Sequence, residues 1–527
     1  MADVIADPET DPRATFVVDP GRVRALTRRV VASGPELTTH SPMTGAPLAT
    51  FATSTAADVV EALGRARAAQ RRWAEVPVAE RARWLLTLHD LVLDRQGELL
   101  DLVQLESGKA RAHAFEEVAD CALVCRYYAR RGRALLAPER HLGVFPVITR
   151  STEHHRPHGV VGIVSPWNYP LSLSVTDALP ALVAGNAVVL RPDPQGTLTA
   201  LAAVGLMVEA GLPEGLVQVV LGPGEPTGQA VVDHADYMCF TGSTATGRTV
   251  AAAAGRRLVG ASLELGGKNT VYVAADADLR RAVPGVLRAC FASAGQLCVS
   301  AERLVVHEAV ADAFLARFLD AVGRMRLSTD LHWGADMGSL VGPAQLARVL
   351  GHVDDAVAHG ARVLTGGAHR PDIGPYVVEP TVLEGVTREM ACRDEETFGP
   401  VVALYRVGSD DEAVALANDT EYGLNASVWT RDVARGRALA ARIQAGTVNV
   451  NEAYAAAWGS IGSPMGGMKA SGLGRRHGRE GILKYTESQN VTVQGLVNVG
   501  DAPGLAGEAY GRGLTRALRV LKAVGLP

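Results

Sequence analysis

The chain is poor in cysteine, with six cysteines in 527 residues and no CxxC pair. This usage argues against a disulfide framework and is typical of a protein kept in a reducing compartment. The N-terminal stretch from Met1 to Glu9 is acidic and lacks the basic start and apolar stretch of a secretory signal. We therefore expect a cytoplasmic location.

Long apolar runs and a strong excess of one charge are also missing. The most apolar segment, 178–190, is interrupted by Pro180, Gly185 and Asn186 and is too short to cross a bilayer. The formal net charge of −4 provides no broad basic field for nucleic acid and no polybasic membrane anchor. We expect neither a nucleic-acid nor a membrane partner, whereas a small uncharged or anionic substrate is compatible with this charge.

What the chain does contain is ample core material, with 47% hydrophobic and 20% charged residues. Its length exceeds what one hydrophobic core supports, so we expect two or three domains. Apolar residues at three- and four-residue spacing predict helices over 56–73, 79–95 and 98–109. The alternating stretch 142–153 predicts a hairpin that pairs with another subunit, and the basic amphipathic stretch 514–522 predicts a helix docked on its own subunit.

From Gly159 onward strands alternate with helices, and a second such rhythm follows Cys298. This alternation predicts parallel βαβ units and an open, doubly wound sheet. The strand 237–241 ends in Gly242-Ser243-Thr-Ala-Thr-Gly247 and enters a helix, an arrangement that brings backbone N–H groups up to a phosphate. The spacing is not the three-glycine fingerprint, and a plain tight turn explains it equally well. The segment 462–478, rich in glycine and serine, predicts a loop.

Three short motifs carry the candidate chemistry. Cys298 ends the run Phe-Ala-Ser-Ala-Gly-Gln-Leu-Cys, Glu264 lies in Leu-Glu-Leu-Gly-Gly-Lys, and Asn168 lies in Pro-Trp-Asn-Tyr-Pro. A lone cysteine is more often a small buried apolar residue, and a lone asparagine often caps a helix. Together, however, the three supply a nucleophile, a base and an amide donor for an oxyanion, which favours thiol attack on a carbonyl.

In this order, over about residues 40 to 495, the motifs resemble the aldehyde dehydrogenase superfamily. Among its members, stretches such as Glu395 to Pro400, Tyr422 to Trp429 and Gly474 to Gly478 are most similar to actinobacterial NADP-dependent succinate-semialdehyde dehydrogenases. The resemblance implies that Cys298 is the nucleophile, Glu264 the general base and Asn168 the oxyanion donor.

The resemblance also implies a domain layout within the α/β class. A Rossmann-type dinucleotide-binding domain would comprise 1–137 and 159–266, and an α/β catalytic domain 267–478. A small β arm for oligomerisation would comprise 138–158 and 479–498, followed by a C-terminal tail over 499–527. We expect a homodimer or a homotetramer.

Cofactor contacts follow from the same resemblance. It assigns the pyrophosphate to Gly242 and Ser243, the nicotinamide ribose to Glu396, and further contacts to Trp167, Arg191, Asp193, Leu265 and Phe398. Pro194 replaces a glutamate that favours NAD in the family, which leaves room for a 2′-phosphate that Arg191 could pair with, although Asp193 opposes this charge. NADP is therefore the expected cofactor, with NAD as the alternative.

The substrate is expected to be succinate semialdehyde, oxidised to succinate through a thiohemiacetal and a thioester on the cysteine. Related enzymes hold the distal carboxylate with two arginines, but these positions are Thr176 and Ala292 here, and Ser460 matches a serine of the same role. Arg126, in a helix expected near the entrance, is a further source of positive charge. An apolar or aromatic aldehyde could instead occupy a tunnel lined by Tyr127, Tyr128, Tyr454, Trp458 and Met465. A non-catalytic protein that keeps the fold is a further alternative, and Glu264 argues against a CoA-acylating enzyme. We expect no catalytic metal.

Overall fold

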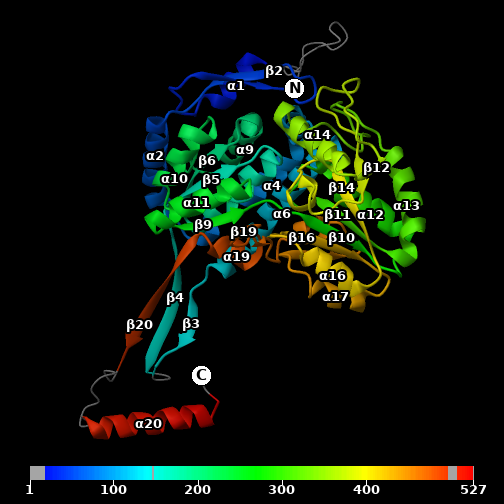
Figure 1. Cartoon of the computed structure of the whole chain (residues 1–527). Helices are drawn as coiled ribbons and strands as arrows, with labels where there is room; N and C mark the ends of the chain where they lie inside the picture. The colour runs from blue at the N-terminus through cyan, green and yellow to red at the C-terminus, as the bar shows by residue number, and fades with distance from the viewer. Residues whose placement is uncertain (1–17, 145–147, 496–506, 526–527) are drawn as a thin grey trace.

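A computed structural model describes residues 18–144, 148–495 and 507–525 (Figure 1). The described chain forms two α/β units beside each other and a β arm that projects from them. The expected α/β architecture is confirmed. No helix among these residues is long and apolar enough to cross a membrane.

Of the N-terminal helices, α2 packs directly on strands of the first sheet, whereas α4, α5 and α6 pack on one another and on the helices that cover that sheet. Helix α2 begins after Thr55, whose hydroxyl accepts from the Asp58 N–H while the Asp58 carboxylate accepts from the Thr55 N–H, a capping box. The helix expected over 79–95 is divided in two, because the chain turns at Ala82 and Arg83. The helices of this layer are α2 (Ala56–Ala74), α3 (Val78–Arg81), α4 (Trp84–Asp94), α5 (Gln96–Ser107) and α6 (Arg111–Leu135).

The first sheet has six strands in the order β19-β9-β8-β5-β6-β7, and all but β19 are parallel. Its central strands are buried on both faces, which explains their continuous apolar sequence. The order reverses between β5 and β8, where ligands of such sheets bind at the carboxyl ends. The strands are β5 (Val160–Ser165), β6 (Ala187–Pro192), β7 (Val217–Val219), β8 (Tyr237–Thr241), β9 (Gly260–Glu264) and β19 (Gly472–Leu473).

The segment 462–478, expected as a loop, contributes the edge strand β19. Gly472 pairs with Glu264 in antiparallel fashion and has a φ of 148°. A Cβ at this position would lie 2.1 Å from the Leu263 carbonyl oxygen, so only glycine permits the close approach. The segment 462–478 therefore pairs with the C-terminal end of β9.

The second sheet has seven strands in the order β12-β13-β14-β11-β10-β16-β17. Only residues 265–268 separate β9 of the first sheet from β10 of the second, so the ends of the two sheets meet at this link. The strands are β10 (Asn269–Val273), β11 (Ala301–His307), β12 (Arg362–Thr365), β13 (Thr381–Glu384), β14 (Val401–Val407), β16 (Asn425–Trp429) and β17 (Thr447–Val450). The main covering helices are α12 (Leu279–Phe291), α13 (Glu308–Gly323), α14 (Pro343–Ala358), α16 (Asp410–Asn418) and α17 (Val433–Ala440).

The arm is a three-stranded antiparallel sheet in the order β20-β4-β3 (Figure 1). Strands β3 (Glu139–Leu142) and β4 (Thr149–Pro157) form the predicted hairpin, and β20 (Thr486–Gln494) joins it from the far end of the sequence. Helix α20 (Glu508–Ala523) lies beyond the arm in Figure 1, and none of its residues is buried. The expectation that this helix docks on its own subunit is therefore wrong for the single chain, which leaves Leu518 and Val520 exposed.

Candidate active site

The structure brings Cys298 and Glu264 together in one pocket at the junction of the two sheets. The residues that line this pocket are Asp120, Leu173, Thr241, Glu264, Leu265, Cys298, Leu424, Trp458, Met465, Arg476 and His477. They come from the ends of β8 and β9, from α6, α7 (Pro170–Val175) and α18 (Ala455–Gly459), from the loops before β11 and β16, and from the segment that carries β19. A thiol, a carboxylate and a cation thus share a largely apolar surrounding, in which electrostatic effects are strong.

Cys298 lies at the end of a tightly constrained loop that follows α12. Ser293 and Ala294 adopt positive φ angles of 52° and 55°, and a Cβ at Gly295 would lie 2.0 Å from the Gly399 carbonyl oxygen. Downstream, the Asn269 Nδ2 donates to the Cys298 carbonyl oxygen at 2.7 Å. Burial, together with the Glu264 and Glu396 carboxylates, raises the pKa of the Cys298 thiol to about 12. The thiol therefore rests protonated and must lose its proton when it attacks.

Glu264 ends strand β9 with its side chain in the pocket. Its Oε1 atom is buried and has no hydrogen-bond partner among the described residues. Burial raises the pKa of Glu264 to about 7, although the positive charge of Arg476 opposes this shift. A carboxyl group with such a pKa can exchange a proton with water near neutral pH, as a general base requires.

Asn168 contacts the cysteine loop through its side-chain amide, whose Nδ2 donates to the Gln296 carbonyl oxygen at 3.0 Å. The Asn168 backbone oxygen accepts from the Lys109 Nζ at 2.5 Å, and Lys109 in turn pairs with Glu117 at 2.7 Å. Glu117 also accepts from two backbone N–H groups in the first turn of α7 (Pro170–Val175). Sequence inspection missed this buried pair, because nothing local links residues 109 and 117 to position 168.

The proposed phosphate turn lies where β8 meets α11 (Thr244–Arg257). Ser243 caps this helix, since its hydroxyl accepts from the Thr246 N–H at 3.3 Å. Added Cβ atoms at Gly242 and Gly247 would lie 2.7 Å from the Phe240 ring and 2.4 Å from the Leu265 side chain, respectively. An alanine at either position would displace these side chains, so the glycines allow the close packing here. The helix N-terminus carries the partial positive charge that suits a phosphate.

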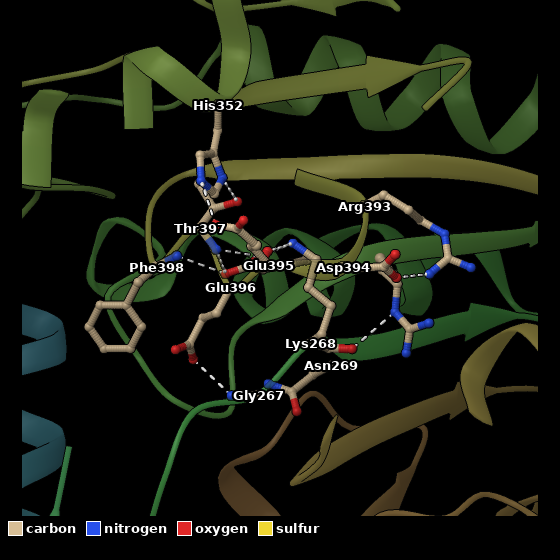
Figure 2. Close-up of polar contacts among 12 residues, drawn as sticks. Gly267, Lys268, Asn269, His352, Arg393, Asp394, Glu395, Glu396, Thr397 and Phe398 are labelled. Carbon is tan, nitrogen blue, oxygen red and sulfur yellow. Dashed lines mark hydrogen bonds and ion pairs between the residues drawn. The ribbon is translucent and has the colours of Figure 1, made fainter. Parts of the chain in front are cut away.

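Figure 2 shows the loop that carries Glu396 and Phe398. The Glu396 Oε1 accepts from the Gly267 N–H at 2.8 Å, and burial raises the pKa of this carboxyl group to about 8. The Phe398 ring meets the Trp167 ring edge-on, with centroids 5.6 Å apart. The loop therefore places Glu396 against the link between the two sheets and Phe398 against Trp167.

A second buried ion pair holds this loop. The Glu302 carboxylate accepts from the backbone N–H groups of Thr397 and Phe398 at 2.8 to 3.0 Å, and it pairs with Lys268. Lys268 also donates to the Glu395 carbonyl oxygen at 2.7 Å (Figure 2). The lysine of the Leu-Glu-Leu-Gly-Gly-Lys motif thus has structural partners, and sequence inspection missed Glu302.

Arg191 and Asp193 lie at the end of β6. The Arg191 Nε and Nη2 both donate to the Gly222 carbonyl oxygen, at 3.0 and 2.7 Å. Asp193 accepts from the Gln195 N–H at 3.0 Å. Burial lowers the pKa of Arg191 and raises that of Asp193, while each charge favours the other. The structure thus brings the two residues together, and both also have protein partners.

The structure places one of the two residues expected to contact the substrate in the pocket and the other outside it. Trp458 lines the pocket with Cys298, whereas Ser460 is exposed and its hydroxyl donates to the Ala456 carbonyl oxygen at 2.6 Å. Thr176 and Ala292 are buried and carry no charge. Elsewhere, on the arm, ligand atoms of Glu139, His141 and Glu153 lie within 4.8 Å of one another, the one such group among the described residues.

Comparison with known proteins places this geometry in context. The model of the aldehyde dehydrogenase family matches residues 30–491. A Mycolicibacterium smegmatis protein named "putative succinate-semialdehyde dehydrogenase (NADP(+))" is 53% identical over 91% of this chain and 93% of its own length. The crystal structure of an NAD-dependent aldehyde dehydrogenase from Sinorhizobium meliloti superposes with a TM-score of 0.85 at 36% identity, covering 88% of this chain and 92% of that one. The crystal structure of a succinate-semialdehyde dehydrogenase from Burkholderia pseudomallei superposes with a TM-score of 0.83 at 34% identity, covering 87% of this chain and 95% of that one.

Proposed function

Because this chain belongs to the aldehyde dehydrogenase family, we propose that it oxidises succinate semialdehyde to succinate with NADP. The observation that carries the chemistry is the pocket shared by Cys298 and Glu264, with the Asn168 amide on the cysteine loop. Support for the aldehyde and for the cofactor comes from the name of the relative that is 53% identical.

The sulfur of Cys298 adds to the aldehyde carbon as the thiol passes its proton to water. The aldehyde oxygen becomes negative in this step. The Asn168 amide and a backbone N–H near the cysteine stabilise it by hydrogen bonds in a buried site. After oxidation the acyl group is held on Cys298 as a thioester. Glu264 removes a proton from the water that attacks this thioester, the C–S bond breaks, and the carboxylate product leaves.

The residues around the pocket fit a dinucleotide. Gly242 and Ser243 would hold its pyrophosphate at the N-terminus of α11, and Glu396 would hold the nicotinamide ribose, with Trp167, Leu265 and Phe398 nearby. When bound, the nicotinamide supplies the acceptor for the hydride of the adduct. Arg191 would face the 2′-phosphate, since Pro194 leaves the position of an opposing carboxylate empty.

A second substrate class has support from the pocket itself. Leu173, Trp458 and Met465 give the pocket apolar walls, and Ser460 does not line it. These walls suit an apolar or aromatic aldehyde. Enzyme kinetics with succinate semialdehyde, hexanal and benzaldehyde, each with NADP and with NAD, test both choices. The substrate proposal fails if succinate semialdehyde has no higher kcat/KM than the other two, and the cofactor proposal fails if NAD gives the higher kcat/KM.

We also propose that the arm joins subunits into a homodimer or a homotetramer in the cytoplasm. Within the described residues strand β20 pairs along one side only, and Val491 and Val493 are 40% and 59% exposed. All six cysteines are free, as a reducing compartment allows. Light scattering of the wild type and of Val493→Asp tests the assembly: wild type and variant of equal mass would contradict it.

A further inference from the structure

A substrate with a distal carboxylate needs a compensating positive charge once it leaves water. Neither Thr176 nor Ala292 provides that charge. Among the described residues that line the pocket with Cys298, Arg476 is the one with a permanent positive charge. It is 7% exposed, so this charge is held inside the protein.

The geometry of Arg476 leaves part of its guanidinium group unused. Its Nη2 donates to the Thr176 Oγ1 at 2.9 Å and lies 2.7 Å from the Asp177 Oδ2. Within the described chain, Nε and Nη1 have no hydrogen-bond partner, although a guanidinium group offers five N–H donors in a planar fork. These remaining donors match the two oxygens of a carboxylate.

Asp177 does not fully neutralise the positive charge of Arg476. The Lys484 Nζ lies 3.1 Å from the Asp177 Oδ1, which also accepts from the Tyr485 hydroxyl at 3.0 Å. Burial acts to raise the pKa of Asp177, but Arg476 and Lys484 hold it well below its usual value, so it stays ionised. Two cations thus share one carboxylate, so Asp177 alone does not neutralise Arg476, although the Glu264 carboxylate in the same pocket also attracts this cation.

Asp120 on α6 is the competing group. It is 3% exposed, and its Oδ2 accepts from the Ser172 hydroxyl. Burial raises the pKa of Asp120 to about 6. The positive charge of Arg476 lowers this pKa, whereas the negative charge of Asp177 raises it further. Cys121 on the same helix stays a neutral thiol because burial raises its pKa, and His477 stays neutral because burial lowers its pKa to about 3.

We infer that Arg476 is the receptor for the distal carboxylate of the substrate, and that an ionised Asp120 competes with that carboxylate for it. This inference rests on the proposed function, because it requires an aldehyde that bears a second acid group. The cation that positions 176 and 292 lack is supplied from the segment that carries β19, some three hundred residues from Thr176 in sequence. Arg476 is thereby a specificity-determining residue.

The test compares succinate semialdehyde with its methyl ester, which has the same chain and no charge. The readout is the ratio of the two kcat/KM values, because both substrates undergo the same chemistry at Cys298 and Glu264. Arg476→Met should lower this ratio about 10-fold to 100-fold, mainly through KM of the acid. Arg475→Met is the matched control, since Arg475 donates to backbone oxygens of Gly467 and Gly474 and does not line the pocket, and it should leave the ratio unchanged.

Asp120→Asn provides a second and opposite test. At a pH above the pKa of Asp120 this substitution should raise the ratio of the two kcat/KM values several-fold. At a pH below that pKa it should change the ratio little. A wild-type preference for the acid that survives Arg476→Met overturns the inference alone, whereas a wild type without such a preference overturns the proposed substrate as well. Should Arg476→Met fail to fold, Asp120→Asn decides: a ratio that does not rise overturns the inference.

Discussion

The Lys109 ammonium group and the Asn168 backbone oxygen lie 2.5 Å apart inside the protein, although 59 residues separate them in sequence. Lys109 also lies over the Tyr169 ring and pairs with Glu117, so one buried cation holds Asn168 and the residue that follows it. The amide proposed to stabilise the oxyanion is therefore held by contacts outside its own motif.

Lys109→Met should destabilise the fold by about 3–5 kcal/mol, because it leaves the Glu117 carboxylate buried without its cation. Denaturant unfolding of the variant measures this change. The double variant Lys109→Met with Glu117→Gln removes both charges and should recover part of the loss. A single variant as stable as the wild type would show that the pair contributes nothing.

Cys298→Ser should abolish NADPH formation, since a serine hydroxyl is a much weaker nucleophile than a thiolate. Cys290→Ser is the control, because Cys290 is buried on α12 and does not line the pocket. Absorbance of NADPH during turnover is the measurement. Acid production by Cys298→Ser at the wild-type rate would overturn the assignment of the nucleophile.

Glu264→Gln should lower kcat by roughly 10²- to 10⁴-fold, because the water that attacks the thioester loses its base. One equivalent of NADPH should still form rapidly, and mass spectrometry should find the acyl group on Cys298. In the wild type, thioester hydrolysis should rise as pH increases through the Glu264 pKa of about 7, since only the ionised form accepts a proton. A pH profile that is the same with and without Glu264 would contradict this role.

Gly242→Ala should raise KM for NADP, because its Cβ would lie 2.7 Å from the Phe240 ring and displace the turn in front of α11. Gly255→Ala in the same helix is the matched control, as a Cβ there would have no neighbour within 4 Å. Alanine at position 255 should keep KM unchanged and add about 1 kcal/mol to stability. Initial rates and thermal unfolding of both variants separate a lost phosphate site from a weakened helix.

The sequence by itself determined the α/β class, the hairpin of the arm and the family, because apolar periodicity and contiguous motifs are local properties of the chain. The same locality identified Cys298, Glu264 and Asn168 as a group without showing what surrounds them. The assignment of their roles, like the domain boundaries, stays a prediction.

Only the tertiary structure decided which distant residues support these motifs. Gly472 pairs with Glu264, Lys109 holds Asn168, and Arg476 reaches Thr176. No sequence spacing predicts these contacts, because each depends on how two segments far apart in the sequence pack together. Burial, which sets the pKa of Glu264 and of Cys298, is likewise a property of the packed molecule rather than of any motif.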